Sequence, residues 1–181
     1  MKDETYILGY HTQEFREESQ ALSVPILCVD KDVWLGEGYY FWRDIEYAHY
    51  WGIDKKKRTG YYDIYSIEID QEFLLDTVFN EDDYEFFKDS IEKAIKKLKI
   101  DRKDYSVTIN EVHTFLKRNV WNEFEDIEGI VFEDIPIGKR HSQIPPLYYK
   151  KRIQIVVFDL RITQNFSLYK EKVKCNEKKK L

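Results

Sequence analysis

Apolar and polar residues alternate over residues 61–70, which predicts a β-strand with one largely apolar face. Tyr65, Ile67 and Ile69 stand on that face, together with Asp63. Short apolar or aromatic runs bounded by polar and turn-forming residues predict further strands. These runs lie at residues 5–10, 25–29, 39–42, 129–133 and 152–158.

Apolar residues recur every three or four positions over residues 82–99, and this spacing predicts the clearest helix of the chain. Its last turn is rich in Lys, which suits the negative end of the helix dipole. Thr108 and Glu111 form a capping-box pattern, so we expect a second helix from Thr108 to about residue 124. We interpret His113, within that helix, as a surface or packing residue rather than a ligand. Shorter helices are predicted over residues 13–22 and over residues 44–52, where Asp44 is placed to act as the N-cap.

Strands and helices mixed in this order predict a single domain of the α+β class. The chain has 181 residues, near the usual size for one hydrophobic core, and 43% of them are hydrophobic. Residues 136–146 are expected to form a loop, whose exit is stiffened by Pro145 and Pro146. Residues 170–181 are a charge run, which we expect to be a frayed or helical tail outside a domain of residues 1–169.

Several classes of protein are disfavoured by the sequence. Residues 2–4 are charged, and the sequence contains no run of about 20 apolar residues that could span a bilayer, so we expect a cytoplasmic protein that binds no membrane. Cys28 and Cys175 lack the spacing of metal or redox sites; we expect the first in inert core and the second as a free thiol in the tail. The four His residues also lack metal-ligand spacing, so no metal is expected. Neither a P-loop nor a complete Rossmann glycine pattern is present.

The net charge of −5 argues against a generic binder of polyanions, although basic residues cluster locally. The clusters lie at residues 55–58, 139–141 and 150–152. Such a cluster is more often a solvated loop than a binding patch. Beside a ligand site, these residues could meet the pyrophosphate of a dinucleotide or the phosphates of a nucleic acid.

The densest group of aromatic residues follows two closely spaced glycines. Gly36 and Gly38 precede the aromatic run of residues 39–42, and glycine lets the backbone take positive φ or approach another group closely. The helix predicted after this strand carries Ala48 and Tyr50. Strand and helix therefore present aromatic rings towards one place.

This segment resembles the nicotinamide-binding segment of ADP-ribosyltransferases of the diphtheria-toxin and PARP type. In that family a Gly-x-Gly-x-Tyr-Phe strand is followed about ten residues later by Ala-x-Tyr on a helix. Gly36, Gly38 and Tyr40, followed by Phe41, fit the strand. Ala48 and Tyr50 fit the helix.

The family also has a His on a first strand and a Glu that opens a late strand. His11 ends the apolar run of the first predicted strand and matches the His. Gln154 occupies the position of the Glu, on the strand predicted over residues 152–158. Thr12 stands where the family usually has Gly. The elements occur in the family's order and are spread over the whole chain.

The resemblance implies a split β-sandwich with an NAD cleft and peripheral helices. It implies transfer of ADP-ribose from NAD to a macromolecular acceptor, protein or nucleic acid, by an intracellular toxin or defence effector with a separate antitoxin protein as partner. His11 would orient the NAD ribose and the Thr12 backbone would hold the carboxamide, while Gln154 would contact the ribose hydroxyl at the reacting carbon. The nicotinamide ring would stack between Tyr40 and Tyr50 or Trp51. The other expected NAD contacts are Gly38, Tyr39 and Ala48.

The Gln at position 154 leaves the chemistry open. Breaking the glycosidic bond of NAD places positive charge on the ribose, which a nearby carboxylate stabilises. Gln154 accepts a hydrogen bond but supplies no charge. Either another carboxylate (Glu37, Glu133 or Asp134) acts in its place, or catalysis is slow, or the protein is a catalytically silent NAD-binding module. If the protein is active, loss of the Glu favours mono-ADP-ribosylation over polymer formation. A third interpretation is a structural protein whose aromatic strand is only core.

Overall fold

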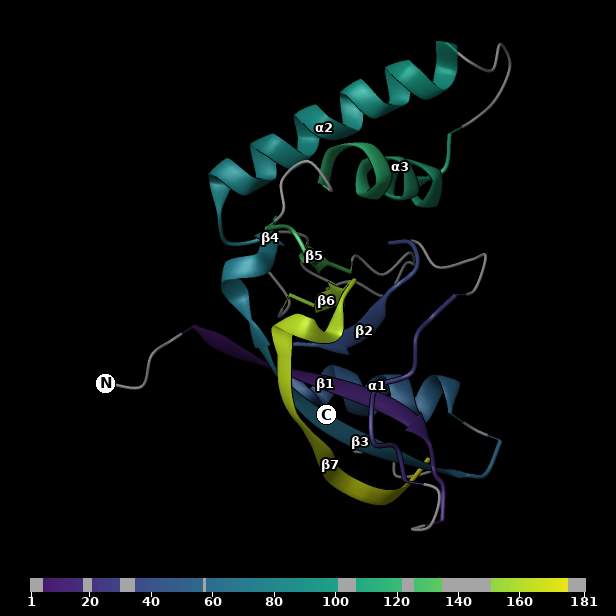
Figure 1. The fold of residues 1–181 in the computed structure, drawn as a ribbon. Coiled ribbons are helices and arrows are strands. Elements are labelled where there is room, and N and C mark those ends of the chain that lie inside the picture. Colours follow the sequence, from purple (N-terminus) through teal and green to yellow (C-terminus); the bar gives the residue numbers. More distant parts are fainter. Residues whose placement is uncertain are drawn as a thin grey trace, which may run out of the picture.

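One mixed β-sheet carries the fold of the described residues (Figure 1). The computed structural model describes residues 5–17, 21–29, 35–56, 58–100, 107–121, 126–134 and 151–175. Within these ranges the strand order is β4-β5-β6-β2-β1-β3-β7, and the β4–β5 pair alone is parallel. With three α-helices in the same ranges, this sheet confirms the predicted α+β class. The strands are β1 (Tyr6–Glu14), β2 (Tyr39–Trp42), β3 (Tyr61–Asp70), β4 (Leu74–Asp76), β5 (Gly129–Glu133), β6 (Ile153–Val157) and β7 (Thr163–Lys174).

The sheet consists of two halves that meet between β1 and β2. In one half, β1 pairs with β3 along its whole length. In the other half, β2 pairs with β6 along its whole length. Between β1 and β2 the described register holds at a single pair, Tyr10 with Trp42. The two strands therefore separate where Thr12 and Tyr40 would otherwise pair, and we name this gap the split.

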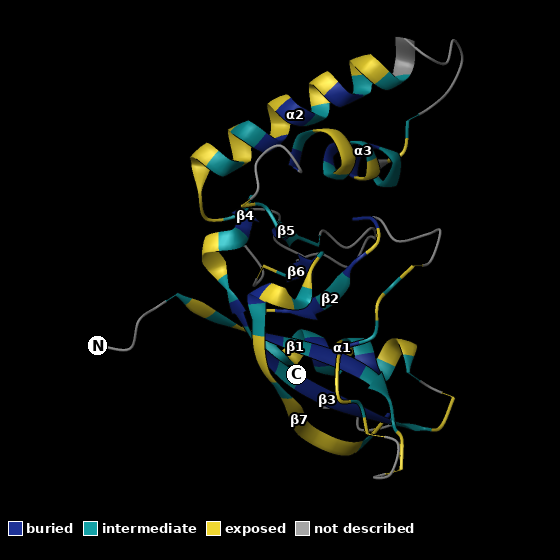
Figure 2. Ribbon diagram, in the orientation of Figure 1, coloured by how far each residue is buried: buried dark blue, intermediate teal, exposed yellow. Residues whose placement is uncertain are grey.

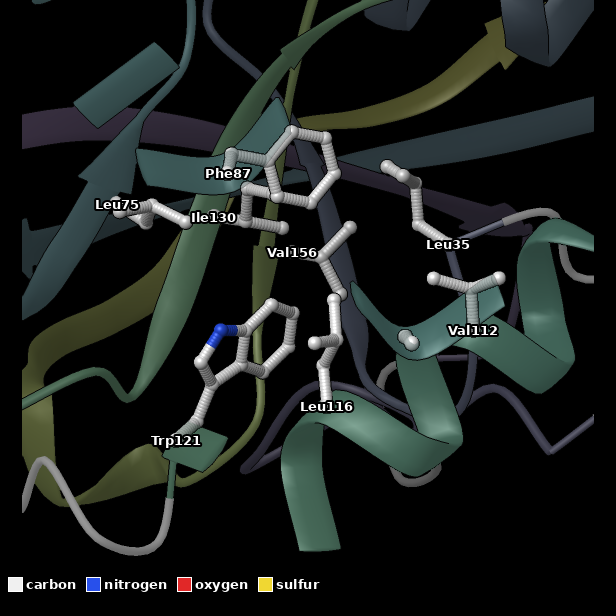
Figure 3. Packing of buried hydrophobic residues seen from close by; sticks show 9 residues of the cluster. Leu35, Leu75, Phe87, Val112, Leu116, Trp121, Ile130 and Val156 are labelled. Carbon is white, nitrogen blue, oxygen red and sulfur yellow. The ribbon is translucent and has the colours of Figure 1, made fainter. Parts of the chain in front are cut away.

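Two helices cover the half of the sheet that contains β4, β5 and β6 (Figure 1). They are α2 (Glu81–Ile100) and α3 (Ile109–Leu116), and a π-helical turn over Lys117–Trp121 follows α3. Their apolar faces pack on one residue from each strand, which gives this half its own buried core. Figure 3 shows that cluster, in which Leu75, Ile130 and Val156 of the sheet meet Phe87, Val112, Leu116, Trp121 and Leu35.

The third helix, α1 (Ile45–Lys55), packs on the other half of the sheet. Ala48 of α1 is fully buried against Trp42, Tyr62 and Ile64. Gly52 allows this close approach, because a Cβ at that position would lie 2.5 Å from the Tyr62 ring. Figure 2 shows the resulting pattern, with buried central strands and exposed residues on the outer side of α2 and along β7.

Several predicted elements are confirmed closely. β2 and β5 have the predicted bounds, and α2 extends one residue beyond residues 82–99 at each end. The capping box is present, with Glu111 N–H donating to Thr108 Oγ1 and Thr108 N–H donating to the Glu111 carboxylate. Asp44 is the N-cap residue of α1, but its side chain makes no capping hydrogen bond.

The helix predicted over residues 13–22 is wrong. β1 continues to Glu14, and the described residues beyond it, 15–17 and 21–22, have no helical structure. The physical reason is the length of β3, whose first residues pair with Gln13 and Glu14 and offer backbone hydrogen bonds to Gln13. A paired strand satisfies those backbone groups as fully as a helix would.

Other expectations need smaller corrections. Residues 25–29 form no strand and contribute a single bridge, Cys28 with Gly38. The expected tail begins inside β7, which runs to Lys174, and Cys175 is buried rather than part of a frayed end. His113 is a packing residue and not a surface one, being 2% exposed. The loop expected at residues 136–146 and the end of the tail, residues 176–181, lie outside the described residues.

Candidate functional site

The backbones of Thr12 and Tyr40 face each other across the split. The Phe15 N–H donates to the Tyr61 carbonyl, so the odd-numbered residues of β1 are those that bond to β3. Thr12, an even-numbered residue, therefore directs its N–H and C=O towards the split. On β2 the Arg43 N–H donates to β6, and the same alternation directs the Tyr40 carbonyl towards the split.

The imidazole of His11 lies at the split and bonds to its far wall. Its Nδ1 is 3.0 Å from the Tyr40 carbonyl oxygen, and its ring contacts the Phe41 ring at a centroid distance of 5.8 Å. Burial lowers the pKa of His11 to about 4; the bond to Tyr40 opposes this shift and the positive charge of Lys56 adds to it. His11 is therefore uncharged at neutral pH.

A neutral His11 presents an acceptor to any ligand that enters. Because the Tyr40 carbonyl can only accept, the ring proton of His11 is assigned to Nδ1, and Nε2 carries the free lone pair. Nε2 is buried and has no hydrogen-bond partner among the described residues. A hydroxyl group placed at the split would supply the missing donor.

Thr12 links the split to α1. Its Oγ1 donates a buried hydrogen bond of 2.9 Å to the Ala48 carbonyl, so two of the predicted NAD-contacting residues are brought together directly. The side chain is thereby occupied. The backbone of Thr12, which is the group expected to hold a carboxamide, remains directed into the split.

The two tyrosines predicted to stack on nicotinamide do not contact each other in the described structure. Tyr40 donates its hydroxyl to the Gly36 carbonyl at 2.7 Å, and its ring packs against the α2–α3 cluster. Burial raises the pKa of Tyr40. Tyr50 is 46% exposed on α1, where its ring contacts that of Tyr47 at 6.0 Å. The structure thus places the Tyr40 ring in the core beneath α2 and α3 and the Tyr50 ring on the exposed side of α1, not in one closed slot.

Gln154 is buried one strand away from the split, with β2 between them, on the face of the sheet that α1 covers. It pairs with Trp42 of β2 and with Phe132 of β5, and cross-strand partners share a face. Tyr40 lies diagonally from it on β2, since Tyr40 pairs with Val156. Gln154 is 7% exposed, and its Oε1 is buried with no hydrogen-bond partner among the described residues.

Gly38 and Tyr39, two further predicted NAD contacts, lie at the start of β2. Gly38 exchanges two backbone hydrogen bonds with Cys28, of 2.9 and 3.2 Å, which bring the segment of residues 21–29 next to the start of β2. A Cβ on Gly38 would lie 2.6 Å from the Val156 side chain. Tyr39 packs its ring on the other face of the sheet, in the cluster of Phe41.

No protein-family model, curated protein or solved structure matches this chain. The function must therefore be inferred from the residues and from the geometry of the split.

Two cations near the predicted site residues were not singled out from the sequence. Lys56 acts electrostatically on His11, and burial lowers the pKa of Lys56 itself. Arg152 lays its guanidinium over Trp42 and Tyr47, 5.4 and 5.8 Å from the ring centroids. Both belong to basic clusters visible in the sequence, at residues 55–58 and 150–152. The sequence clusters indicate a local positive charge, but they do not indicate which basic residue of each cluster is directed inward.

Two adjoining pockets lie on the α3 side of the molecule, with volumes of about 670 and 250 Å³. Both are lined by Lys117, Trp121 and Phe158, and the predicted NAD-contacting residues are absent from their described linings. Among the described residues, no group of three His, Cys, Asp or Glu side chains is placed to hold a metal ion. No described helix is both long enough and apolar enough to cross a membrane.

Proposed function

We propose that this protein is an NAD-dependent mono-ADP-ribosyltransferase that moves ADP-ribose from NAD to a protein or nucleic-acid acceptor and releases nicotinamide. The proposal includes an ADP-ribosyltransferase-like split β-sandwich as the finer description of the fold. NAD would enter the split between β1 and β2. A cytoplasmic effector or toxin with an antitoxin partner is the biological setting that the resemblance implies.

The observation that carries the proposal is a pair of buried, unpaired acceptors. His11 Nε2 and Gln154 Oε1 have no partner among the described residues. An unsatisfied buried polar group costs about 1–3 kcal/mol, so a ligand that donates hydrogen bonds to these two acceptors would recover that cost. These are the two positions at which the resemblance implies contact with NAD ribose hydroxyls, which are hydrogen-bond donors.

The backbone arrangement supports the same proposal. The matched residues lie on three adjacent strands, His11 on β1, Tyr40 on β2 and Gln154 on β6, and α1 carries Ala48 and Tyr50 beside them. Thr12 offers a backbone N–H and C=O at one edge of the split, which is the complement of a carboxamide with its own acceptor and donors.

The test is incubation of the purified protein with labelled NAD and a cell extract that is afterwards separated into protein and nucleic-acid fractions. We expect label in one fraction with the wild type, and none with His11→Ala. His113→Leu is the matched control, because it removes a buried His whose ring packs on Phe87 and Trp121, and this variant should transfer normally. Equal transfer by His11→Ala and wild type would contradict the proposed role of the split.

A silent NAD-binding module is the second candidate, and the neutral Gln154 with the cation of Arg152 near it favours it. This candidate predicts that NAD raises the melting temperature of the wild type, since a ligand that binds only the folded state stabilises it. It predicts no release of nicotinamide. Stabilisation together with nicotinamide release would exclude this candidate. If NAD causes neither stabilisation nor nicotinamide release, the third interpretation holds, in which the aromatic strand is only core.

A further inference from the structure

Three carboxylates could replace the charge that Gln154 lacks, and the structure separates them. Glu37 precedes Gly38, at the opposite end of β2 from Trp42, the partner of Gln154. It lines the smaller of the two pockets beside Lys117. Glu37 therefore lies about five residues along the chain, or roughly 17 Å of extended strand, from the level of Gln154.

Glu133 stands on the face of the sheet opposite Gln154. It pairs with Ile153, whose side chain packs in the cluster of Phe41 on the face opposite Gln154. Its carboxylate is bound to Lys151 at 3.6 Å. Side chains alternate along a strand, so the next residue, Asp134, returns to the face of Gln154.

Asp134 is a diagonal neighbour of Gln154. Its N–H donates to the Arg152 carbonyl at 2.8 Å, so the pairing of β5 with β6 continues one residue beyond the strand ends. Phe132 lies directly opposite Gln154, and Asp134 directly opposite Arg152. Diagonal neighbours in an antiparallel pair are about 7–8 Å apart, which long side chains or a bound ligand can span.

Arg152 fixes the Asp134 carboxylate in this position. Its Nη2 donates to Asp134 Oδ2 at 2.5 Å, while the guanidinium rests on Trp42 and Tyr47. The Nε of Arg152 is buried without a partner among the described residues, as is the Oε1 of Gln154. An unpaired donor and an unpaired acceptor thus lie on one face of β6, which is the complement of a hydroxyl group.

We propose that Asp134 supplies the negative charge that stabilises the ribose cation, with Arg152 as its positioning residue. This rests on the proposed transferase function. The bond between ribose C1′ and the nicotinamide ring nitrogen breaks, and both electrons leave with nicotinamide, which becomes neutral. An acceptor oxygen or nitrogen then adds to C1′ and releases its proton to water. Asp134 stays ionised throughout, and it also offsets the positive charge of Arg152, which alone would oppose a cation at C1′.

The test measures nicotinamide release and NAD binding for Asp134→Asn. We expect kcat to fall about a hundredfold, the usual effect of removing one electrostatic contact to a transition state, with little change in KM for NAD. Glu133→Gln is the matched control, since it removes the adjacent carboxylate on the other face, and its kcat should remain that of the wild type. In the double variant Asp134→Asn, Gln154→Glu, the new carboxylate should recover at least about tenfold in kcat.

The outcomes distinguish a failure of the role proposed for Asp134 from a failure of the proposed transferase function. A wild-type protein that releases no nicotinamide overturns the transferase function and the role of Asp134 together. Turnover by the wild type with an equal kcat for Asp134→Asn overturns the role of Asp134 alone. If Asp134→Asn does not fold, Asp134→Glu and Asp134→Gln are compared, because they share a length and differ in charge; an equal kcat for these two overturns the proposal as well.

Discussion

His11 and His113 are buried as neutral bases, and each makes the stability of the fold depend on pH. Burial lowers the pKa of both side chains from 6.5 to about 4. For His113, a contact with the Leu35 backbone that does not reach hydrogen-bond geometry opposes the shift. Between pH 6.5 and 4 the unfolded chain binds protons that the folded chain does not. The free energy of unfolding must therefore fall as the pH falls through this window.

Replacing His113 by Leu should weaken that dependence. Its two ring nitrogens have no hydrogen-bond partner among the described residues, and Phe87 and Trp121 surround the ring. We expect His113→Leu to be at least as stable as the wild type at pH 7. Its unfolding free energy should fall less steeply from pH 6.5 to 5, by up to about 1.4 kcal/mol per pH unit. Urea unfolding at several pH values measures this, and parallel slopes for the two proteins would contradict it.

Position 154 gives a second prediction at the scale of one residue. Gln154→Glu places a carboxylate where the unpaired Oε1 lies, so we expect NAD hydrolysis to rise by at least about tenfold. Nicotinamide release in the absence of an acceptor measures it. An unchanged baseline, with NAD still bound, would show that Gln154 is not beside the reacting carbon.

At the scale of elements, the last residues of β7 belong to the domain despite their charges. Lys172 N–H donates to the carboxylate of Asp63, which is 2% exposed and also accepts from Arg16 N–H. Lys174 pairs with Tyr61, and the thiol of Cys175 is buried near α1. The boundary expected after residue 169 therefore falls inside a paired strand.

A chain ending at residue 169 should be less stable than one ending at residue 175. The shorter chain leaves Asp63 with one hydrogen-bond donor fewer and uncovers the start of β3, so we expect a loss of about 2–4 kcal/mol. Thermal and urea unfolding of the two chains measures the difference. Equal stability would mean that the pairing beyond residue 169 contributes nothing in solution.

The sequence predicted correctly those elements whose own pattern of apolar and polar residues matches the faces that they bury and expose. β2 carries aromatic residues on both faces, and α2 and the capping box of α3 follow helical spacing. The wrong predictions concern segments whose secondary structure is determined by pairing with a strand that is distant in the sequence. Gln13 and Glu14 are polar and yet extended because β3 faces them, and the charged end of β7 is extended because it is an exposed edge paired to β3.

The candidate site was predictable only as a set of positions. His11, Tyr40 and Gln154 were named from the resemblance to ADP-ribosyltransferases, and they do lie on adjacent strands. The backbone alternation that turns Thr12 towards the split depends on which neighbour each edge of β1 has. Likewise the choice of Asp134 over Glu133 depends on the register of β5 with β6. A slip of one residue would reverse that choice.

At the scale of the whole molecule, each half of the sheet has its own helices and its own core. α2 and α3 complete the half with β4, β5 and β6, and α1 completes the half with β1, β3 and β7. The Tyr10–Trp42 pair and the contacts of α1 with both halves join them. A ligand in the split would touch both halves at once, so its binding should stabilise the molecule as a unit.

The joint between the halves should be visible in the exchange of amide hydrogens with deuterium. The amides of His11 and Gln13 bond to β3 and are expected to exchange slowly, whereas the amide of Thr12, between them, faces the split and should exchange orders of magnitude faster. Nuclear magnetic resonance resolves the three signals, and equal protection of all three would show that the strands pair in solution. Addition of NAD should slow Thr12 and leave its neighbours unchanged. A single backbone hydrogen would then report occupancy of the site, independently of any catalysis.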